Sequence, residues 1–164
     1  MMFKQLRIIA VLALFAAFTG CSDDDEPVVE PTLEVNYANV AGIWQLSEWN
    51  GEAMDADSRY FYIRLSRSQE NGSRSYEIYT NLNSFVSEYI SGTYELNLEE
   101  PNFPLISGTY DYTLSTDDEW AHQFVVSELY QASMKWTAED DTDEVRVYKR
   151  CDEIPADIVD GERL

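Results

Sequence analysis

From Ala38 onward, apolar and polar residues alternate in short runs with a period of two rather than 3.6. In the run from Tyr60 to Ser66, for example, Phe61, Ile63 and Leu65 fall on one face. The breaks between runs carry Asn, Asp, Gly, Ser and Pro, which favour turns. The pattern therefore predicts eight strands, over residues 43–49, 60–66, 75–80, 86–98, 106–114, 120–128, 132–138 and 145–150.

The segments between these runs are short or rich in turn residues, and none has room for a long helix. Consecutive strands joined in this way form an antiparallel meander. The run ISGTYEL at residues 90–96 recurs as ISGTYDY at 106–112, as expected for neighbouring strands of a barrel that bend sharply at Gly92 and Gly108. The sequence predicts an all-β fold, an eight-stranded antiparallel meander closed into a β-barrel. Such an interior is either filled or holds one small ligand.

The chain before the strands has a different character. Lys4 and Arg7 precede an apolar run from Ile8 to Phe18, which is shorter than the roughly 20 residues that span a bilayer. Residues 1–20 therefore predict a secretion signal. Residues 21–37 are rich in acids and Pro and predict an extended, flexible tether. The barrel is expected over residues 38–155, followed by a C-terminal tail at 156–164.

Charge and motif content narrow the classes of function. The chain has 31 acidic against 11 basic residues and a formal net charge of −20, a field that disfavours nucleic acid as a partner. A single histidine excludes a His-rich metal site. The sequence lacks the H-E-x-x-H and G-x-S-x-G motifs and any glycine-rich phosphate loop. We therefore expect no enzyme, catalytic residue, metal or cofactor, although so many acids leave paired-carboxylate hydrolysis open.

Three features with possible chemistry have simpler structural interpretations. His122 shares a face with Phe124 and Val126, which favours a hydrogen-bonded polar group at the barrel wall or rim. Cys151 is expected to be half-buried rather than a nucleophile. The acidic run EDDTDE at 139–144 lacks the alternating ligands of an EF-hand, so it predicts a solvated turn between the last two strands more than a calcium loop.

The aromatic content of 13%, with 11 Tyr and 4 Trp, suits both a packed core and a site for flat ligands or sugars. Four of these aromatic residues fall on or near the inward faces and are candidate ligand-binding residues: Tyr94, Tyr112, Trp120 and Trp136. The alternative is that they simply fill the barrel. Three others have the opposite parity and are expected on the outside: Tyr60, Tyr62 and Tyr89.

The run Gly42-Ile43-Trp44 at the start of the first strand resembles the Gly-x-Trp signature of lipocalin barrels. The resemblance implies that Trp44 plugs the closed end and that a basic residue packs over its indole ring. Arg150 in VYKRC is the first candidate for that role and Arg146 the second. The blocks ISGTY, DEW and VYKR are, more specifically, similar to lipocalin-like surface lipoproteins of Bacteroidota, over roughly residues 38–155.

The run Phe18-Thr19-Gly20-Cys21 resembles a bacterial lipobox, which implies that Cys21 is lipidated and becomes the mature N-terminus. The acids that follow, within residues 22–26, resemble the lipoprotein export signal of Bacteroidota and imply a cell-surface location on the outer membrane. They also suit a solvated spacer. With lipid on Cys21, Cys151 is the one remaining thiol, and an intramolecular disulfide is not possible.

Two functions fit these features. The first is a surface-tethered lipoprotein whose lipocalin-like barrel binds a small apolar, aromatic or sugar-like ligand at its open end. The second is a non-catalytic structural or interaction lipoprotein with a filled barrel, accessory to a surface complex. Both attach to the membrane through the lipid anchor. The sequence identifies neither the ligand nor a protein partner.

Overall fold

The computed structural model describes residues 30–55, 57–68, 72–84, 86–99, 104–112 and 119–161. Within these ranges the chain forms nine strands and two short helices. In chain order they are α1 (Tyr37–Val40), β1 (Gly42–Trp49), β2 (Glu52–Ala53), β3 (Phe61–Leu65), β4 (Ser75–Thr80), β5 (Glu88–Asn97), β6 (Leu105–Tyr110), β7 (Phe124–Ser127), β8 (Ser133–Ala138), β9 (Val145–Cys151) and α2 (Ala156–Val159).

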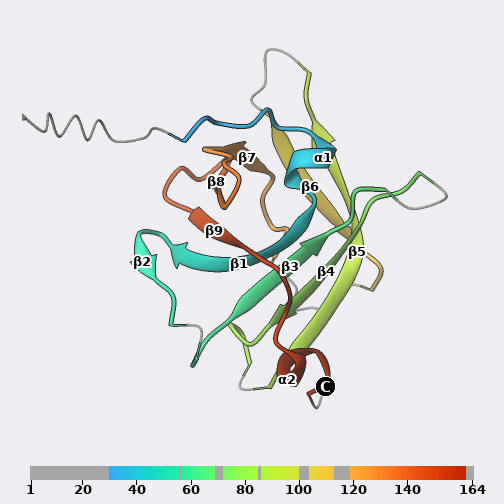
Figure 1. Ribbon diagram of the computed structural model, residues 1–164, viewed down its shortest axis with the longest axis vertical. Coiled ribbons are helices and arrows are strands. Elements are labelled where there is room, and N and C mark those ends of the chain that lie inside the picture. Colours follow the sequence, from blue (N-terminus) through green and yellow to red (C-terminus); the bar gives the residue numbers. More distant parts are fainter. Residues whose placement is uncertain are drawn as a thin grey trace, which may run out of the picture.

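The strands form one antiparallel sheet that closes on itself (Figure 1). Each strand from β3 to β9 pairs with its neighbour in the chain, and β9 returns to pair with β1. The short strand β2 is a hairpin extension of β1 and lies outside this closed set. The predicted all-β fold, an eight-stranded antiparallel meander barrel, is thus confirmed.

The eight predicted strands correspond to β1 and β3–β9, and β6 and β7 depart most from the predicted bounds. Strand β6 ends at Tyr110, whereas the alternation continued to residue 114, and the last residues of that run lie outside the described ranges. Strand β7 begins at Phe124, and residues 120–123 form a turn rather than the start of a strand. The short elements β2, α1 and α2 carry no period-two signal and were not predicted.

A β-bulge at Ser47 changes which side chains of β1 face inward. The pairing of β1 with β9 shifts between Leu46 and Glu48, and the Ser47 hydroxyl donates to the Val147 carbonyl oxygen at 3.0 Å. The extra residue breaks the strict alternation, because a bulge inserts one unpaired position. Trp49 therefore pairs opposite Arg146 and turns to the inside, where strict alternation would have placed Glu48.

The two ISGTY segments lie side by side as the paired strands β5 and β6. Thr93 pairs with Thr109, so each glycine of the repeat faces a tyrosine of the other copy, Gly92 opposite Tyr110 and Tyr94 opposite Gly108. A Cβ on Gly92 would lie 1.9 Å from the Thr109 carbonyl oxygen. A Cβ on Gly108 would lie 2.2 Å from the indole ring of Trp120. Because Gly92 and Gly108 have no side chain, the Thr109 carbonyl group and the Trp120 ring can pack directly against the backbone at these two positions.

Large side chains fill the barrel. The largest of those that are essentially inaccessible are Trp44, Trp136, Tyr76, Tyr94, Tyr148 and Phe124. Trp136 occupies a central position, because its ring centroid lies 4.7 Å from that of Tyr148 and 5.6 Å from that of Phe124. Offset aromatic contacts of this kind stabilise a core beyond the burial of their area.

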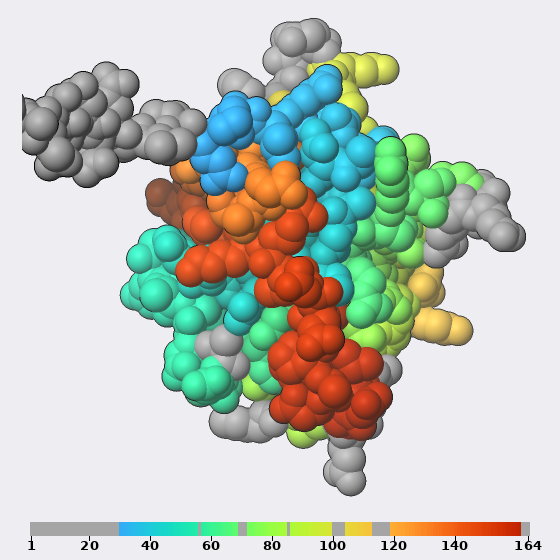
Figure 2. Space-filling view, viewed as in Figure 1, coloured from blue at the N-terminus to red at the C-terminus, as the bar shows by residue number. Residues whose placement is uncertain are grey.

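A second, smaller apolar cluster lies on the outside of the barrel. Ile154 and Ile158, from the segment around α2, pack on Tyr62 of β3 and Tyr79 of β4. Figure 2 shows this C-terminal segment, in red, lying over the green residues of the barrel wall. The tyrosines of this outer face are thereby largely removed from water, with Tyr62 only 6% exposed.

The first prediction concerns the paired glycines. Gly92→Ala should lower the free energy of unfolding by at least about 2 kcal/mol, because the new methyl group meets backbone rather than a movable side chain. Urea denaturation measures the change. Thr93→Ala, at the exposed neighbouring position, is the control and should shift stability by less than about 0.5 kcal/mol. Equal effects of the two substitutions would contradict the packing.

Candidate functional site

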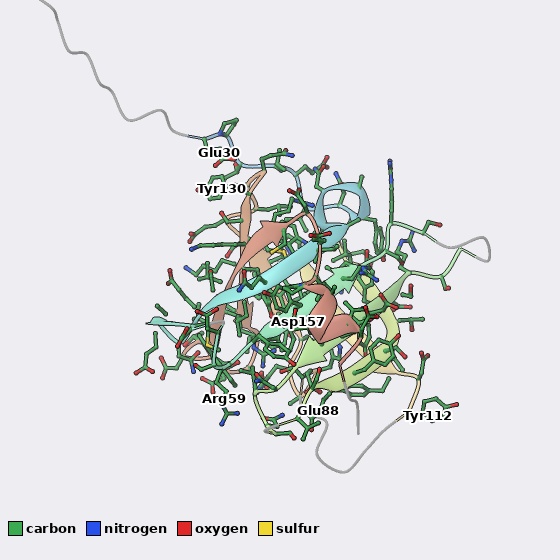
Figure 3. The ribbon with its side chains drawn as sticks, turned by 60° about the horizontal axis from the view of Figure 1, so that its bottom comes forward. Glu30, Arg59, Glu88, Tyr112, Tyr130 and Asp157 are labelled. Atoms are coloured by element: carbon green, nitrogen blue, oxygen red, sulfur yellow. The ribbon has the colours of Figure 1, made fainter. Side chains whose placement is uncertain are left out.

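The two ends of the barrel differ in construction. We call the end where α1 precedes β1 the closed end, and the end where β1 and β4 finish and β3 begins the mouth. Figure 3 shows Glu30 and Tyr130 at the first of these ends and Arg59 and Glu88 at the other. The closed end is sealed by side chains, whereas the mouth contains a pocket.

Trp44 and Arg150 hold the closed end together. Trp44 is fully buried, and its Nε1 donates to the Val40 carbonyl oxygen at 2.8 Å. The Arg150 guanidinium carbon lies 4.0 Å from the centroid of the Trp44 ring. The same guanidinium donates to the carbonyl oxygens of Asn39, Ala41 and Gln131, each at 2.8 Å. Arg150, and not Arg146, therefore occupies the position over the indole ring.

Gly42 makes this arrangement possible. Its φ is +140°, and a Cβ at this position would lie 2.4 Å from Arg150 Nη1. Both the backbone conformation and the available space thus require glycine, since L side chains rarely adopt such a φ. The three residues of the predicted barrel-end motif, Gly42, Trp44 and Arg150, are in contact.

The segment before β1 covers the closed end. The Asn36 side chain caps α1 by accepting from the backbone amides of Ala38 and Asn39, each at 3.0 Å. The Leu33 amide donates to the Leu129 carbonyl oxygen at 2.7 Å, and the Leu96 amide donates to the Tyr37 hydroxyl at 2.9 Å. These bonds tie the segment to β5 and to the loop between β7 and β8.

The mouth contains a pocket with apolar walls and a few polar groups. Its apolar lining comes from Leu46, Trp49, Phe61 and Leu82, and its polar lining from Thr80, Asn83, Glu119 and Arg146. The enclosed cavity volume is only ≈ 20 Å³, about the room of one water molecule. With the part open to solvent the pocket measures ≈ 320 Å³, near the lower limit of ligand sites.

Arg146 is the charged centre of the mouth and is 8% exposed. Its Nε donates to Glu144 Oε1 at 2.8 Å, and its Nη1 donates to the Glu119 carbonyl oxygen at 3.3 Å. Its guanidinium carbon lies 4.6 Å from the centroid of the Phe124 ring. The carboxylates of Glu144 and Glu119 accompany this guanidinium, so these three groups together carry no surplus of positive charge.

Glu144 links Arg146 to Trp49. Trp49 Nε1 donates to both carboxylate oxygens of Glu144, at 3.0 and 2.9 Å, and Asn50 Nδ2 donates to Oε2 at 3.2 Å. Burial alone raises the pKa of Glu144, but the hydrogen bonds from Trp49 and Arg146 outweigh it and hold this pKa below its usual range. Glu144 is therefore a structural anion that fixes the Trp49 wall of the pocket.

The four candidate ligand-binding residues do not form one site. Trp120 and Trp136 are together in the interior, with ring centroids 5.7 Å apart. Tyr94 lies toward the closed end, where its hydroxyl donates to the Ser66 carbonyl oxygen at 2.6 Å. Tyr112 is 85% exposed because β6 ends before it. None of the four lines the mouth pocket.

Four polar tips of the interior aromatic side chains make no hydrogen bond of good geometry within the described residues: Tyr76 Oη, Tyr148 Oη, Trp120 Nε1 and Trp136 Nε1. Tyr76 nevertheless interacts with Trp120, and Tyr148 with Arg146, so Trp136 Nε1 is the most isolated of these donors. They belong to one contiguous stack, since Tyr76 contacts Trp120, Trp120 contacts Trp136 and Trp136 contacts Tyr148. Burial raises the pKa of Tyr148 to about 12, so its phenol stays neutral. The centre of the barrel is thus aromatic but contains donors that a water molecule or ligand could satisfy.

The other polar features of the sequence have structural partners. His122 Nδ1 lies 2.6 Å from Asp140 Oδ1, at the rim of the barrel. Burial raises the pKa of Cys151, so its sulfur is a thiol at neutral pH. Residues 139–144 form the turn between β8 and β9, and the Asp143 amide donates to Asp141 Oδ1 at 3.1 Å within it.

Among the described residues, no group of three or more His, Cys, Asp or Glu side chains is arranged to hold a metal ion. No helix in the same part of the chain is long and apolar enough to cross a membrane. The predicted signal segment and the predicted lipidation site Cys21, together with the first part of the tether, lie outside the described residues.

Several mouth residues were not among the sequence candidates. Trp49 was missed because the bulge at Ser47 moves its side chain to the inner face of the barrel. A lone serine in the sequence gives no strong signal of a bulge. Thr80 and Glu119 stand at the end of a strand and in a turn, where alternation carries no information. Arg146 and Phe61 had a detectable signal, since Arg146 has the same parity as Tyr148 and Phe61 the same parity as Ile63 on inward faces.

Comparison of the chain with protein-family models, with curated proteins and with solved structures gives no match. The eight-stranded closed barrel is compatible with a lipocalin-like fold, and this statement rests on the geometry alone.

The second prediction concerns the closed end. Arg150→Met keeps an apolar stem over Trp44 but removes the charge and the donors to three carbonyl oxygens. It should lower the free energy of unfolding by about 3 kcal/mol, measured by urea denaturation. Lys149→Met, on the outer face of the same strand, is the control and should change stability by less than about 0.5 kcal/mol. If Arg150→Met leaves the free energy of unfolding unchanged, the packing of Arg150 on Trp44 does not contribute to stability.

The third prediction concerns acid stability. Because the pKa of Glu144 is lowered in the folded state, its contribution to stability is present above the unfolded pKa, ordinarily near 4.5, and is lost as the pH falls through the folded pKa. Glu144→Gln should therefore be less stable than the original protein at pH 6, and the difference should shrink as the pH is lowered toward 3. Urea unfolding at each pH measures it. Glu139→Gln, on the exposed turn, is the control, and its stability relative to the original protein should not change in this way with pH.

Proposed function

We propose that the protein is a lipid-anchored surface protein of the outer membrane whose barrel binds a small neutral ligand at its mouth. In this proposal Cys21 carries the lipid, the segment up to residue 37 is the tether, and the protein is not an enzyme and uses no cofactor. The lipobox-like run before Cys21 and the acids after it support the anchor. The ligand class is apolar, aromatic or sugar-like.

The mouth pocket is the observation that supports ligand binding. It combines the two aromatic walls of Trp49 and Phe61 with the hydrogen-bonding groups of Thr80, Asn83 and Glu119. A flat face beside a few polar groups is the usual composition of a site for a sugar or an aromatic ring. The enclosed ≈ 20 Å³ limits the ligand to partial insertion, so most of it lies in the open part of the pocket.

The charges around the pocket favour a neutral ligand. Arg146 is already paired with Glu144, and the Glu119 side chain, 6% exposed, brings a second acid to the same region. The formal net charge of −20 adds long-range repulsion of anions. Among the described residues that line the pocket, Arg146 is the one cation, and its pairing with Glu144 leaves little positive charge for a carboxylate or phosphate ligand.

A second candidate is a filled barrel that serves as an accessory to a surface complex. The observation in its favour is the packed interior, where Trp44, Trp136 and Tyr148 are each at most 1% exposed. A barrel whose lumen is occupied by its own side chains needs no ligand for stability.

The fourth prediction separates these two candidates. Native mass spectrometry of the protein from its own source should detect a retained neutral small molecule. Leu82→Trp, which fills the mouth, should remove that molecule while leaving the urea unfolding midpoint nearly unchanged. Leu98→Trp, at an exposed position away from the pocket, should retain it. If the original protein carries no small molecule, the result would favour the second candidate, an accessory protein whose barrel is filled by its own side chains.

The anchor is tested separately. Cys21→Ser should abolish incorporation of labelled fatty acid and release the protein from the membrane fraction. Protease added to intact cells should degrade the original protein. Survival of the protein until the cells are lysed would contradict the surface location.

A further inference from the structure

The β1–β2 hairpin extends the barrel wall beyond the mouth. Figure 1 shows β2 at the edge of the barrel, past the end of β1. The two strands are joined at Asn50 and Gly51, whose φ angles are +53° and +82°, as is typical of a tight two-residue hairpin turn. The turn is attached to the start of β9, because the Asn50 amide donates to the Val145 carbonyl oxygen and the Val145 amide donates to Asn50 Oδ1, both at 2.7 Å. The hairpin is therefore held in place at its tip.

One face of the hairpin continues the inner wall of the barrel. Trp49 faces inward at the end of β1, and Glu52 of β2 pairs directly opposite to it. Paired residues of antiparallel strands share a face, so Glu52 lies on the side of Trp49. Met54 follows two residues later and packs against the main core cluster, which confirms the direction of this face. The inner wall thus extends past the mouth, with Trp49 at the junction.

A hollow lies along this hairpin and adjoins the mouth pocket. Its lining comes from Trp49, Asn50, Glu52, Ala53 and Met54. With the part open to solvent it measures ≈ 660 Å³, about twice the ≈ 320 Å³ of the mouth pocket. Trp49 belongs to both linings, so the two hollows meet at this residue. The mouth pocket alone is near the lower limit of ligand sites, whereas the two hollows together are well within the usual range.

Trp49 is a fixed platform between the two hollows. Its Nε1 donates to both carboxylate oxygens of Glu144, and Asn50 Nδ2 donates to the same carboxylate. An aromatic side chain that is already held in one orientation loses little conformational freedom when a ligand packs on it. The shared wall of the two hollows is therefore preorganised for a ligand that spans both.

Each hollow carries a carboxylate, Glu119 in the mouth and Glu52 on the hairpin. An ionised carboxylate accepts hydrogen bonds and donates none, so a neutral ligand has to provide the donors. A purely apolar ligand, or one with only carbonyl or ether oxygens, would remove water from these carboxylates without replacing its hydrogen bonds. Sugar hydroxyl groups are donors, and the apolar face of a sugar ring fits an indole ring. This chemistry favours a sugar over the other neutral ligands.

We infer that the mouth pocket and the hairpin hollow form one elongated site for a neutral oligosaccharide. One sugar residue occupies the mouth, and the next lies on the hairpin beyond Trp49. This inference rests on the proposed function, which it narrows from a small neutral ligand to a chain of at least two sugar residues. The formal net charge of −20 disfavours acidic sugars at the same site.

Isothermal titration calorimetry of the full-length protein, in a detergent that contains no sugar, tests the inference. The probes are cello-, malto- and N-acetylchito-oligosaccharides of one to four residues. In at least one series the affinity should rise at least about tenfold from one residue to two, because the second residue gains the hairpin contacts without a further cost of association. Longer chains should add little.

A matched pair of variants locates the second sugar residue. Glu52→Trp fills the hairpin hollow from its inner face and should remove the gain from one residue to two. Glu48→Trp makes the same change of charge and size on the opposite, exposed face of the hairpin and should retain the gain. Leu82→Trp in the mouth should abolish the binding of every chain length. Urea unfolding of each variant verifies that the fold is intact.

The outcomes separate this inference from the proposed function. Equal affinity for one residue and two, or equal effects of Glu52→Trp and Glu48→Trp, would overturn the elongated site and leave a ligand in the mouth. The same holds if no sugar binds while native mass spectrometry detects a retained neutral molecule. If no sugar binds and no molecule is retained, both proposals are wrong.

Discussion

Pairing of the first barrel strand with the last is the constraint on which the rest of the structure depends. All other pairs of barrel strands join successive strands of the meander, whereas β1 and β9 meet across about a hundred residues, from Ile43 opposite Cys151 to Trp49 opposite Arg146. Closing so long a loop is entropically costly, and side-chain contacts at the seam must offset it. The stack of Arg150 on Trp44 secures one end of this seam and the Trp49–Glu144–Arg146 cluster secures the other.

The sequence predicted most of the barrel because nearly every strand is buried on one face only, and such strands alternate. The prediction worked least well where this condition fails. At Ser47 the bulge adds a residue, and Trp49 moves to the inside. At Tyr112 the alternation in the sequence continues but the strand has ended, so a residue expected to face the interior is on the surface. Pairing, and not the pattern alone, decides the side of a residue.

The candidate site was harder to predict for a different reason. The pocket at the mouth combines residues from segments that are distant in the sequence, and the combination has no fixed spacing. The C-terminal segment is acidic and resembles a solvated tail, yet Ile154 and Ile158 are four residues apart and cover Tyr62. That spacing is the one local signal that the segment packs. The stacking partner of Trp44 was predictable because a family resemblance, and not periodicity, indicated a basic residue there.

The path of the chain into the barrel sets the polarity of the whole domain. Glu30 lies beside the loop between β7 and β8, where its carboxylate accepts from the Gln131 amide at 3.1 Å, and the segment that follows runs across the closed end. In the proposed anchored protein, the tether would therefore join the domain at its sealed end. The mouth pocket would then lie at the end of the barrel opposite to the attachment.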